Sequence, residues 1–169
     1  MKNIFKRLNN DQRGVTLIEI LIVMGLLSTL LIVIATIFTS AVDVQQQSNS
    51  YSATNSSGRF IMQRLDWDIS HASIVNTPSV LGTSSSNLNL TISGNSYNYV
   101  LNGNDLQLTD NIGTDNLNSN DVTVSGLNFQ ILGNSGGKPT IQYSFTLTSI
   151  VKNHGNSSVQ SFTGTEGLR

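Results

Sequence analysis

The sequence predicts an α+β fold, in which one long N-terminal hydrophobic helix packs on a small antiparallel β-sheet. Three observations predict this fold. An uncharged apolar run extends from Ile20 to Val42. A second set of apolar residues recurs at the spacing of one helix face; its members are Ile61, Leu65, Ile69 and Ala72. After Val80, apolar and polar residues alternate, which is the period of a β-strand with one buried face.

The apolar run predicts a transmembrane helix over residues 15–42. A helix of about 20 apolar residues crosses the hydrocarbon core of a bilayer, which is about 30 Å thick. Backbone groups in lipid must bond within their own segment, so the run should be helical. Basic residues precede it; they are Lys2, Lys6, Arg7 and Arg13. This charge bias predicts a single-pass membrane protein with a cytoplasmic N-terminus and an extracytoplasmic C-terminal domain.

One acid interrupts the start of this run. The run is longer than the core of a secretory signal peptide, and no small-residue cleavage site follows it, so an uncleaved anchor fits better. Glu19, however, stands just inside the apolar segment. An unpaired carboxylate in the membrane costs about 3 kcal/mol, so this acid either has a function or lies at the headgroup level, where its carboxylate reaches water.

The residues around Glu19 carry a resemblance to a known family. The stretch from Arg13 to Val23 has Gly, an apolar residue, Thr-Leu, any residue, Glu and then a long apolar segment. It resembles the prepilin cleavage and methylation motif of type IV pilins and type II secretion pseudopilins. The resemblance implies a basic leader of residues 1–14, cut between Gly14 and Val15 by a prepilin peptidase that also methylates the Val15 amine. Most family members have Phe where this chain has Val15.

The chemistry of the motif follows from its residue types. Gly14 has no side chain to obstruct the scissile bond. Cleavage leaves a positive amine on Val15, and Glu19, four residues on, is expected one helical turn away on the same face. The resemblance implies that Glu19 neutralises the amine of an adjacent subunit. An ion pair that is costly when unmatched fixes the register of packed helices. Thr16 and Leu17 complete this assembly motif.

The helix is expected to continue beyond the membrane. It should run from about Val15 to about Ser73, weakened around Ser56–Gly58, with an amphipathic part over residues 43–73. Asp66 and Asp68 point to different faces of a helix and are expected to be solvated. The stretch Ser57–Ala72 resembles the helix-end block of J-type minor pseudopilins and W-type minor pilins.

Residues 74–169 are expected to form the antiparallel β-sheet domain. The Asn102-Gly103 step between two alternating runs predicts a hairpin. Loops are expected at Asp110–Asp121 and Gly133–Lys138. The expected strands cover Leu88–Ile92, Tyr97–Leu101, Leu106–Leu108, Val122–Val124, Leu127–Leu132 and Ile141–Val151, with a final short strand that includes Val159 and Phe162.

The sequence offers little catalytic or metal-binding chemistry. Cysteine is absent, and His71 and His154 stand in no recognisable motif. Three acids form a weak candidate calcium loop without the EF-hand spacing; they are Asp110, Asp115 and Asp121. No cofactor is expected. Only 11% of the residues are charged and the net charge is −1, which argues against an electrostatic site for nucleic acid.

These observations favour a minor pilin or pseudopilin, a structural subunit of a pilus-like filament and not an enzyme. The resemblance implies four partners: prepilin peptidase/methylase, other pilin or pseudopilin subunits, an inner-membrane assembly platform, and membrane lipid before assembly. The assembled filament would lie at the cell surface or in the periplasm. The machine stays open between pilus, type II secretion and competence. The alternative is a permanently membrane-anchored, adhesin-like binding module; an anchored enzyme lacks a catalytic constellation.

Overall fold

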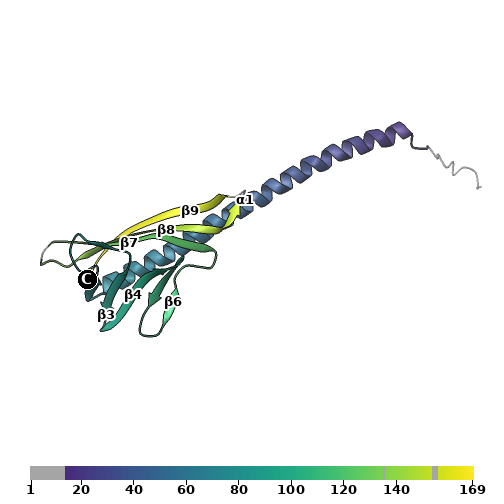
Figure 1. Cartoon of the computed structure of the whole chain (residues 1–169). Coiled ribbons are helices and arrows are strands. Elements are labelled where there is room, and N and C mark those ends of the chain that lie inside the picture. The colour runs from purple at the N-terminus through teal and green to yellow at the C-terminus, as the bar shows by residue number, and fades with distance from the viewer. Residues whose placement is uncertain (1–13, 135, 154–155) are drawn as a thin grey trace, which may run out of the picture. The chain divides into compact units, whose positions relative to one another are not determined.

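The computed structural model describes residues 14–134, 136–153 and 156–169. Two compact units divide the chain, one that ends at Val42 and one that covers Asp43–Arg169. Helix α1, Leu17–His71, begins in the first unit and ends in the second (Figure 1). It starts and stops two residues inside the expected limits, and it runs unbroken through Ser56–Gly58, where the sequence led us to expect a weak point.

The second half of α1 buries the predicted apolar stripe. Ile61, Leu65 and Ile69 are fully buried in the core, and Ala72, just beyond the helix, joins them. Gly58 lies directly against the ring of Phe162, which leaves no room for a side chain at position 58. The expected weak point is therefore a close packing contact, which explains why a glycine within the helix is tolerated there.

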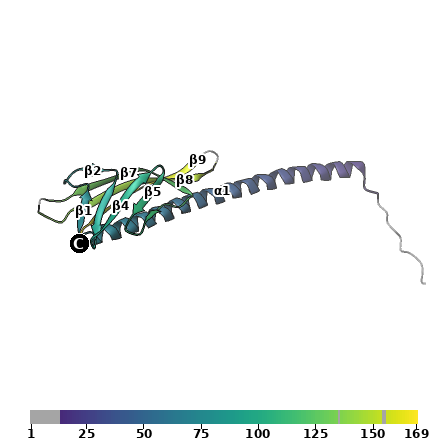
Figure 2. The same cartoon turned by 60° about the horizontal axis from the view of Figure 1, so that its bottom comes forward.

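The strands form two antiparallel sheets, where a single sheet was expected. The five-stranded sheet has the order β1-β3-β4-β5-β6 and the four-stranded sheet the order β2-β7-β8-β9. The bounds are β1 Ile74–Thr77, β2 Ser84–Ser85, β3 Leu88–Ile92, β4 Asn95–Asn102, β5 Asp105–Thr109, β6 Thr114–Asn116, β7 Val122–Leu132, β8 Thr140–Asn153 and β9 Asn156–Gly167. Both sheets lie on one side of the second-unit part of α1 (Figure 2). The alternation of apolar and polar residues predicts that each strand has one buried face. That pattern is the same whether the strands form one sheet or two, so it could not predict the division.

Strands β1 and β2 were not among the expected strands, and the other strands differ from the expected ones in three places. The two runs Val122–Val124 and Leu127–Leu132 form one strand, β7, with an irregularity around Gly126, whose φ is 63°. Strand β6 lies inside the segment expected as a loop. The last strand, β9, has 12 residues and is not short. The hairpin at Asn102-Gly103 is confirmed, with Asn102 paired to Asp105 and Gly103 at a positive φ of 63°.

Two helix acids contradict the expectation that they are solvated. Asp68 is fully buried; its Oδ2 accepts hydrogen bonds from the Tyr99 hydroxyl and from Arg64 Nε, the latter at 2.9 Å. Asp66 is half-buried, and the Tyr143 hydroxyl donates to its Oδ1 at 2.5 Å. The two acids do point to different faces, but a strand tyrosine reaches each of them. Burial and the adjacent carboxylates raise the pKa of both tyrosines.

Candidate processing and assembly site

The predicted cleavage site lies just before α1. Gly14 is exposed, with open space where a Cβ would stand, and Val15 is 65% exposed. Because the helix begins at Leu17, Val15 and Thr16 precede its first turn. The bond between Gly14 and Val15 therefore lies in non-helical, exposed chain, which a peptidase can hold in extended form.

Thr16 caps the helix. Its carbonyl accepts hydrogen bonds from the Glu19 and Ile20 amides at 3.1 and 3.2 Å. Its Oγ1 also accepts the Glu19 amide at 3.3 Å. A threonine at the cap satisfies an amide that has no partner inside the helix. The spacing Thr16-x-x-Glu19 is that of a capping box, a local signal from which this bond could be expected, although the cleavage motif alone does not indicate it.

Glu19 sits in the first turn of α1 and presents its carboxylate outwards from the helix start. Among the described residues, no donor bonds to its side chain and no cation pairs with it. Its negative charge lies near the positive end of the helix dipole, which favours it there. A complete capping box has two hydrogen bonds, one from the Glu19 amide to the Thr16 hydroxyl and one from the Thr16 amide to the Glu19 carboxylate. Within the described chain only the first is formed. The carboxylate can therefore accept a partner from another chain.

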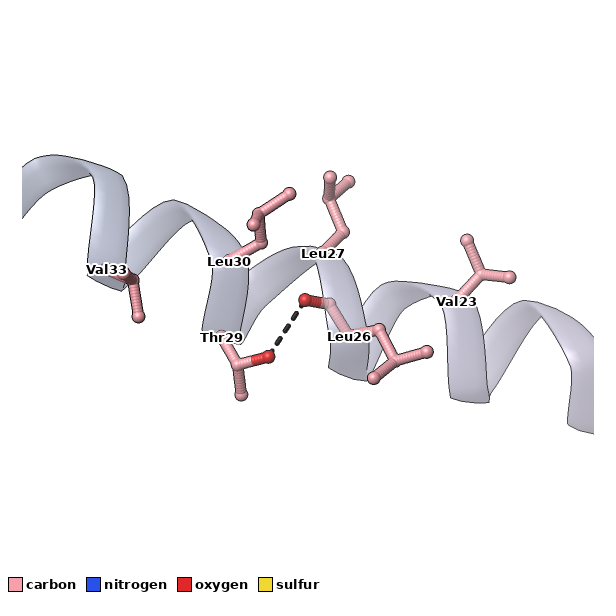
Figure 3. Close-up of a pocket in the computed structure, with 6 residues that line it drawn as sticks. All are labelled: Val23, Leu26, Leu27, Thr29, Leu30 and Val33. Carbon is pink, nitrogen blue, oxygen red and sulfur yellow. Dashed lines mark hydrogen bonds between the residues drawn. The ribbon is translucent and has the colours of Figure 1, made fainter.

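The helix beyond Glu19 presents bare apolar side chains. From Ile20 to Phe38, each large apolar residue is between 48% and 68% exposed. Figure 3 shows one face of this segment, where Val23, Leu26, Leu27, Leu30 and Val33 stand out from the ribbon beside Thr29. In the described chain, α1 is the one helix that is long and apolar enough to cross a membrane.

The hydroxyl groups in this segment are all satisfied on the helix itself. Each donates to a backbone carbonyl three or four residues earlier, at 2.7 to 2.9 Å. The residues are Ser28, Thr29, Thr36, Thr39 and Ser40. Figure 3 shows the bond from Thr29 to the Leu26 carbonyl. A hydroxyl that needs no outside partner lowers the cost of placing the segment in lipid or against an apolar neighbour.

The structure brings the assembly residues together but not the candidate calcium ligands. Gly14, Val15, Thr16, Leu17 and Glu19 all lie at the start of α1, whereas residues 1–13 of the leader lie outside the described residues. No group of three or more His, Asp or Glu side chains suited to a metal occurs in the described part of the chain.

The candidate calcium ligand Asp110 has a role within its own loop. Its Oδ1 accepts the amides of Ile112 and Gly113 at 2.7 and 3.1 Å, which lowers the pKa of its carboxyl. Of the two histidines, His71 stacks on Trp67 at 4.2 Å between ring centres, and His154 lies outside the described residues.

Comparison with known proteins supports the motif. A family model described as the prokaryotic N-terminal methylation motif matches residues 9–39. No curated protein and no solved structure matches the chain. The matched segment contains Gly14, Val15, Thr16, Leu17 and Glu19 together with most of the exposed apolar face.

The chain is thus prepilin-like, with an α+β pilin-like fold of one long helix packed against antiparallel sheets. The motif implies processing by a prepilin peptidase and a structural role, not an enzymatic one. One apolar N-terminal helix is consistent with a membrane-anchored precursor.

Proposed function

We propose that this chain is a minor pilin or pseudopilin, a structural subunit of a type IV pilus-like filament. The observation that carries the proposal is the Glu19 carboxylate, unpaired among the described residues, in the first turn of an exposed apolar helix that matches the methylation motif. The precursor waits in the inner membrane with its N-terminus in the cytoplasm. Prepilin peptidase cuts after Gly14 and methylates the Val15 amine. An assembly platform then moves the helix from lipid into the filament.

The mechanism is an exchange of environments for α1. Its exposed apolar face is covered by lipid tails before assembly and by the helices of other subunits afterwards. Glu19 makes this exchange specific, because its charge is stable in the apolar bundle only opposite a cation. The new amine of Val15 in the adjacent subunit supplies that cation. Thr16 holds the first turn, so that the carboxylate is presented at a fixed height.

The subtype rests on the second half of α1. The stretch Ser57–Ala72 resembles J-type minor pseudopilins and W-type minor pilins, which supports a minor subunit of a secretion, pilus or competence system. In this chain the same stretch carries the buried stripe and the buried Asp68. Its residue types therefore suit the packing of this domain whichever machine uses the subunit.

The proposal is tested by co-expression with a prepilin peptidase, followed by intact mass and N-terminal sequencing. The native chain should begin at Val15 and carry one added methyl group. Gly14→Val should stay uncut, because a branched side chain then flanks the scissile bond. Gly25→Val is the matched control and should be cut normally; neither glycine has an atom within 4 Å of an added Cβ, so neither change causes a clash within the chain.

Glu19→Ala separates processing from assembly. The variant should be cut and should remain in the membrane, yet it should fail to enter filaments when the other subunits are present. A native chain that keeps its leader beside an active peptidase would overturn the filament proposal. It would leave the membrane-anchored, adhesin-like module as the better account.

A further inference from the structure

One end of the β8–β9 hairpin exposes a cluster of branched apolar side chains. Ile150, Val151 and Val159 are 55%, 43% and 59% exposed. Val159 pairs with Thr148 and Lys152 pairs with Ser157, and Ile150 and Val151 lie in the irregular stretch of β8 between these two pairs. Exposed apolar area of this kind costs about 25 cal/mol for each Å² left in water. A hairpin end with three such side chains is suited to contact an apolar phase.

The charges around this end of the hairpin suit a lipid surface. Lys152 is exposed next to the apolar cluster, and lysine beside aliphatic residues is the pairing found at membrane interfaces. Asp121 lies on the β7 side of β8, where its carbonyl accepts the Ile150 amide at 2.8 Å. Strand β9, on the other side, has no acid before Glu166. The β9 edge near Val159 is thus the side of the hairpin that suits a lipid surface.

The hairpin end is attached to α1 at a residue close in sequence to the apolar run. Ser50 Oγ donates to the Val151 carbonyl at 3.4 Å, which ties the hairpin to α1. Ser50 stands eight residues after Val42, the last residue of the uncharged run. Eight residues span at most about 28 Å even when fully extended, so this limit holds for every arrangement of the two units. Tyr51 comes next and is 59% exposed, and tyrosine is enriched at membrane interfaces.

We propose that Ile150, Val151 and Val159 dip into the interfacial layer of the bilayer that holds the unassembled subunit, with Lys152 at the headgroups. The partner is the lipid surface on the extracytoplasmic side. The proposal rests on the membrane-anchored precursor proposed above. It adds a second, reversible membrane contact, which extraction into the filament must break. A contact of three side chains is weak enough to release and strong enough to orient a tethered domain.

The test uses the absence of cysteine from the chain. Three single-cysteine variants of the full chain, Val159→Cys, Thr165→Cys and Leu30→Cys, are labelled with an environment-sensitive dye. Each is reconstituted in phosphatidylcholine–phosphatidylglycerol vesicles whose lipids carry a quencher. Position 165 is the matched control, because Val159 and Thr165 are both exposed on one face of β9, about 20 Å apart along the strand.

We expect strong quenching at position 30 and severalfold more quenching at position 159 than at position 165. Ile150→Asp in the Val159→Cys chain should reduce quenching to the level of position 165. If position 30 is quenched while 159 and 165 are alike, the hairpin contact is wrong and the anchor stands. If position 30 is not quenched, the membrane-anchored precursor itself fails. The dye at position 159 could instead show a blue shift of its emission that grows with protein density and is unaffected by the lipid quencher. That result would mean that a second subunit covers the hairpin, which overturns the proposal.

Discussion

Asp66 and Asp68 link one helix to two sheets. Asp68 binds Tyr99 of β4 in the five-stranded sheet, and Asp66 binds Tyr143 of β8 in the four-stranded sheet. Asp68 Oδ1 is buried and has no hydrogen-bond partner in the described part of the chain, so this carboxylate depends on Tyr99 and Arg64. When a buried carboxylate loses a hydrogen-bond donor, the free energy of unfolding of the protein falls by about 1–3 kcal/mol.

The raised pKa of Tyr99 predicts a pH dependence of stability. Burial, and next the charge of Asp68, favour the neutral phenol in the folded state. An unfolded tyrosine ionises near pH 10, so between that pH and the higher folded pKa the folded chain holds a proton that the unfolded chain has lost. The contribution of Tyr99 to the free energy of unfolding should therefore be constant below about pH 9 and fall above about pH 10. The urea midpoint in detergent, measured at pH 7 and pH 11, reports this fall.

Two variants isolate the contribution of this tyrosine. Tyr99→Phe should lower the midpoint at pH 7, because Asp68 loses a donor, and should show a smaller loss between pH 7 and pH 11 than the native chain. Tyr97→Phe changes a half-buried tyrosine of the same strand whose hydroxyl bonds to no described residue, and it should leave both midpoints nearly native. Equal alkaline losses in Tyr99→Phe and the native chain would contradict the explanation.

Among the elements, contacts between α1 and the strands decide what the sequence could and could not predict. The stripe of Ile61, Leu65 and Ile69 was predictable, because helical spacing alone places these residues on one face. Asp68 lies three residues after Leu65 and thus borders that stripe, but nothing in the helix sequence announces a tyrosine 31 residues away. The division into two sheets depends on which strands pair, and alternation carries no information on pairing.

The start of α1 was predicted better than the domain. The cleavage-site residues Gly14 and Val15 lie within five positions of Glu19, the residue expected to set the register of packed helices. A linear sequence motif therefore contains nearly all of this site. The capping bond from the Glu19 amide to Thr16 is also local and could have been found from the Thr16-x-x-Glu19 spacing. By contrast, the contact between Gly58 and Phe162 joins residues over a hundred positions apart, and the sequence indicated only a weak helix at that glycine.

Gly58 allows the packing of α1 against β9 to be tested. Alanine is the better helix former by about 1 kcal/mol, yet its Cβ would strike the Phe162 ring, and overpacking costs about 1–3 kcal/mol. Because Phe162 also stacks on Phe145 at 5.3 Å between ring centres, it cannot move freely. Gly58→Ala should therefore lower the free energy of unfolding, by about 1 kcal/mol net, as measured by urea titration.

The same substitution should change sign when the ring is removed. In a Phe162→Ala chain, Gly58→Ala should raise the free energy of unfolding by up to about 1 kcal/mol, because only the helix preference remains. The double-mutant cycle compares the two effects within one experiment. Additive effects of the two substitutions would show that the helix and β9 do not press on each other at this point.

At the scale of the whole molecule, the two units differ in what covers their apolar side chains. The unit that ends at Val42 has exposed apolar side chains and internally bonded hydroxyls, so its free energy depends on lipid or on other subunits. The unit Asp43–Arg169 has its own core, built from the Ile61–Ala72 stripe and both sheets, so its free energy depends on burial within the chain. A substitution in one unit should change one property and leave the other alone.

Leu30→Asp and Gly58→Ala form a reciprocal pair for this prediction. A carboxylate near the middle of a membrane helix costs about 3 kcal/mol, so Leu30→Asp should reduce the fraction of chain that resists carbonate extraction from membranes. Its urea midpoint, followed by tryptophan fluorescence of Trp67 in detergent, should stay native, since distant sites add independently. Gly58→Ala should do the reverse, with a lower midpoint and unchanged retention in the membrane. A lower midpoint in Leu30→Asp would mean that the apolar segment supports the folded domain, and α1 would then have to be treated as a single cooperative element.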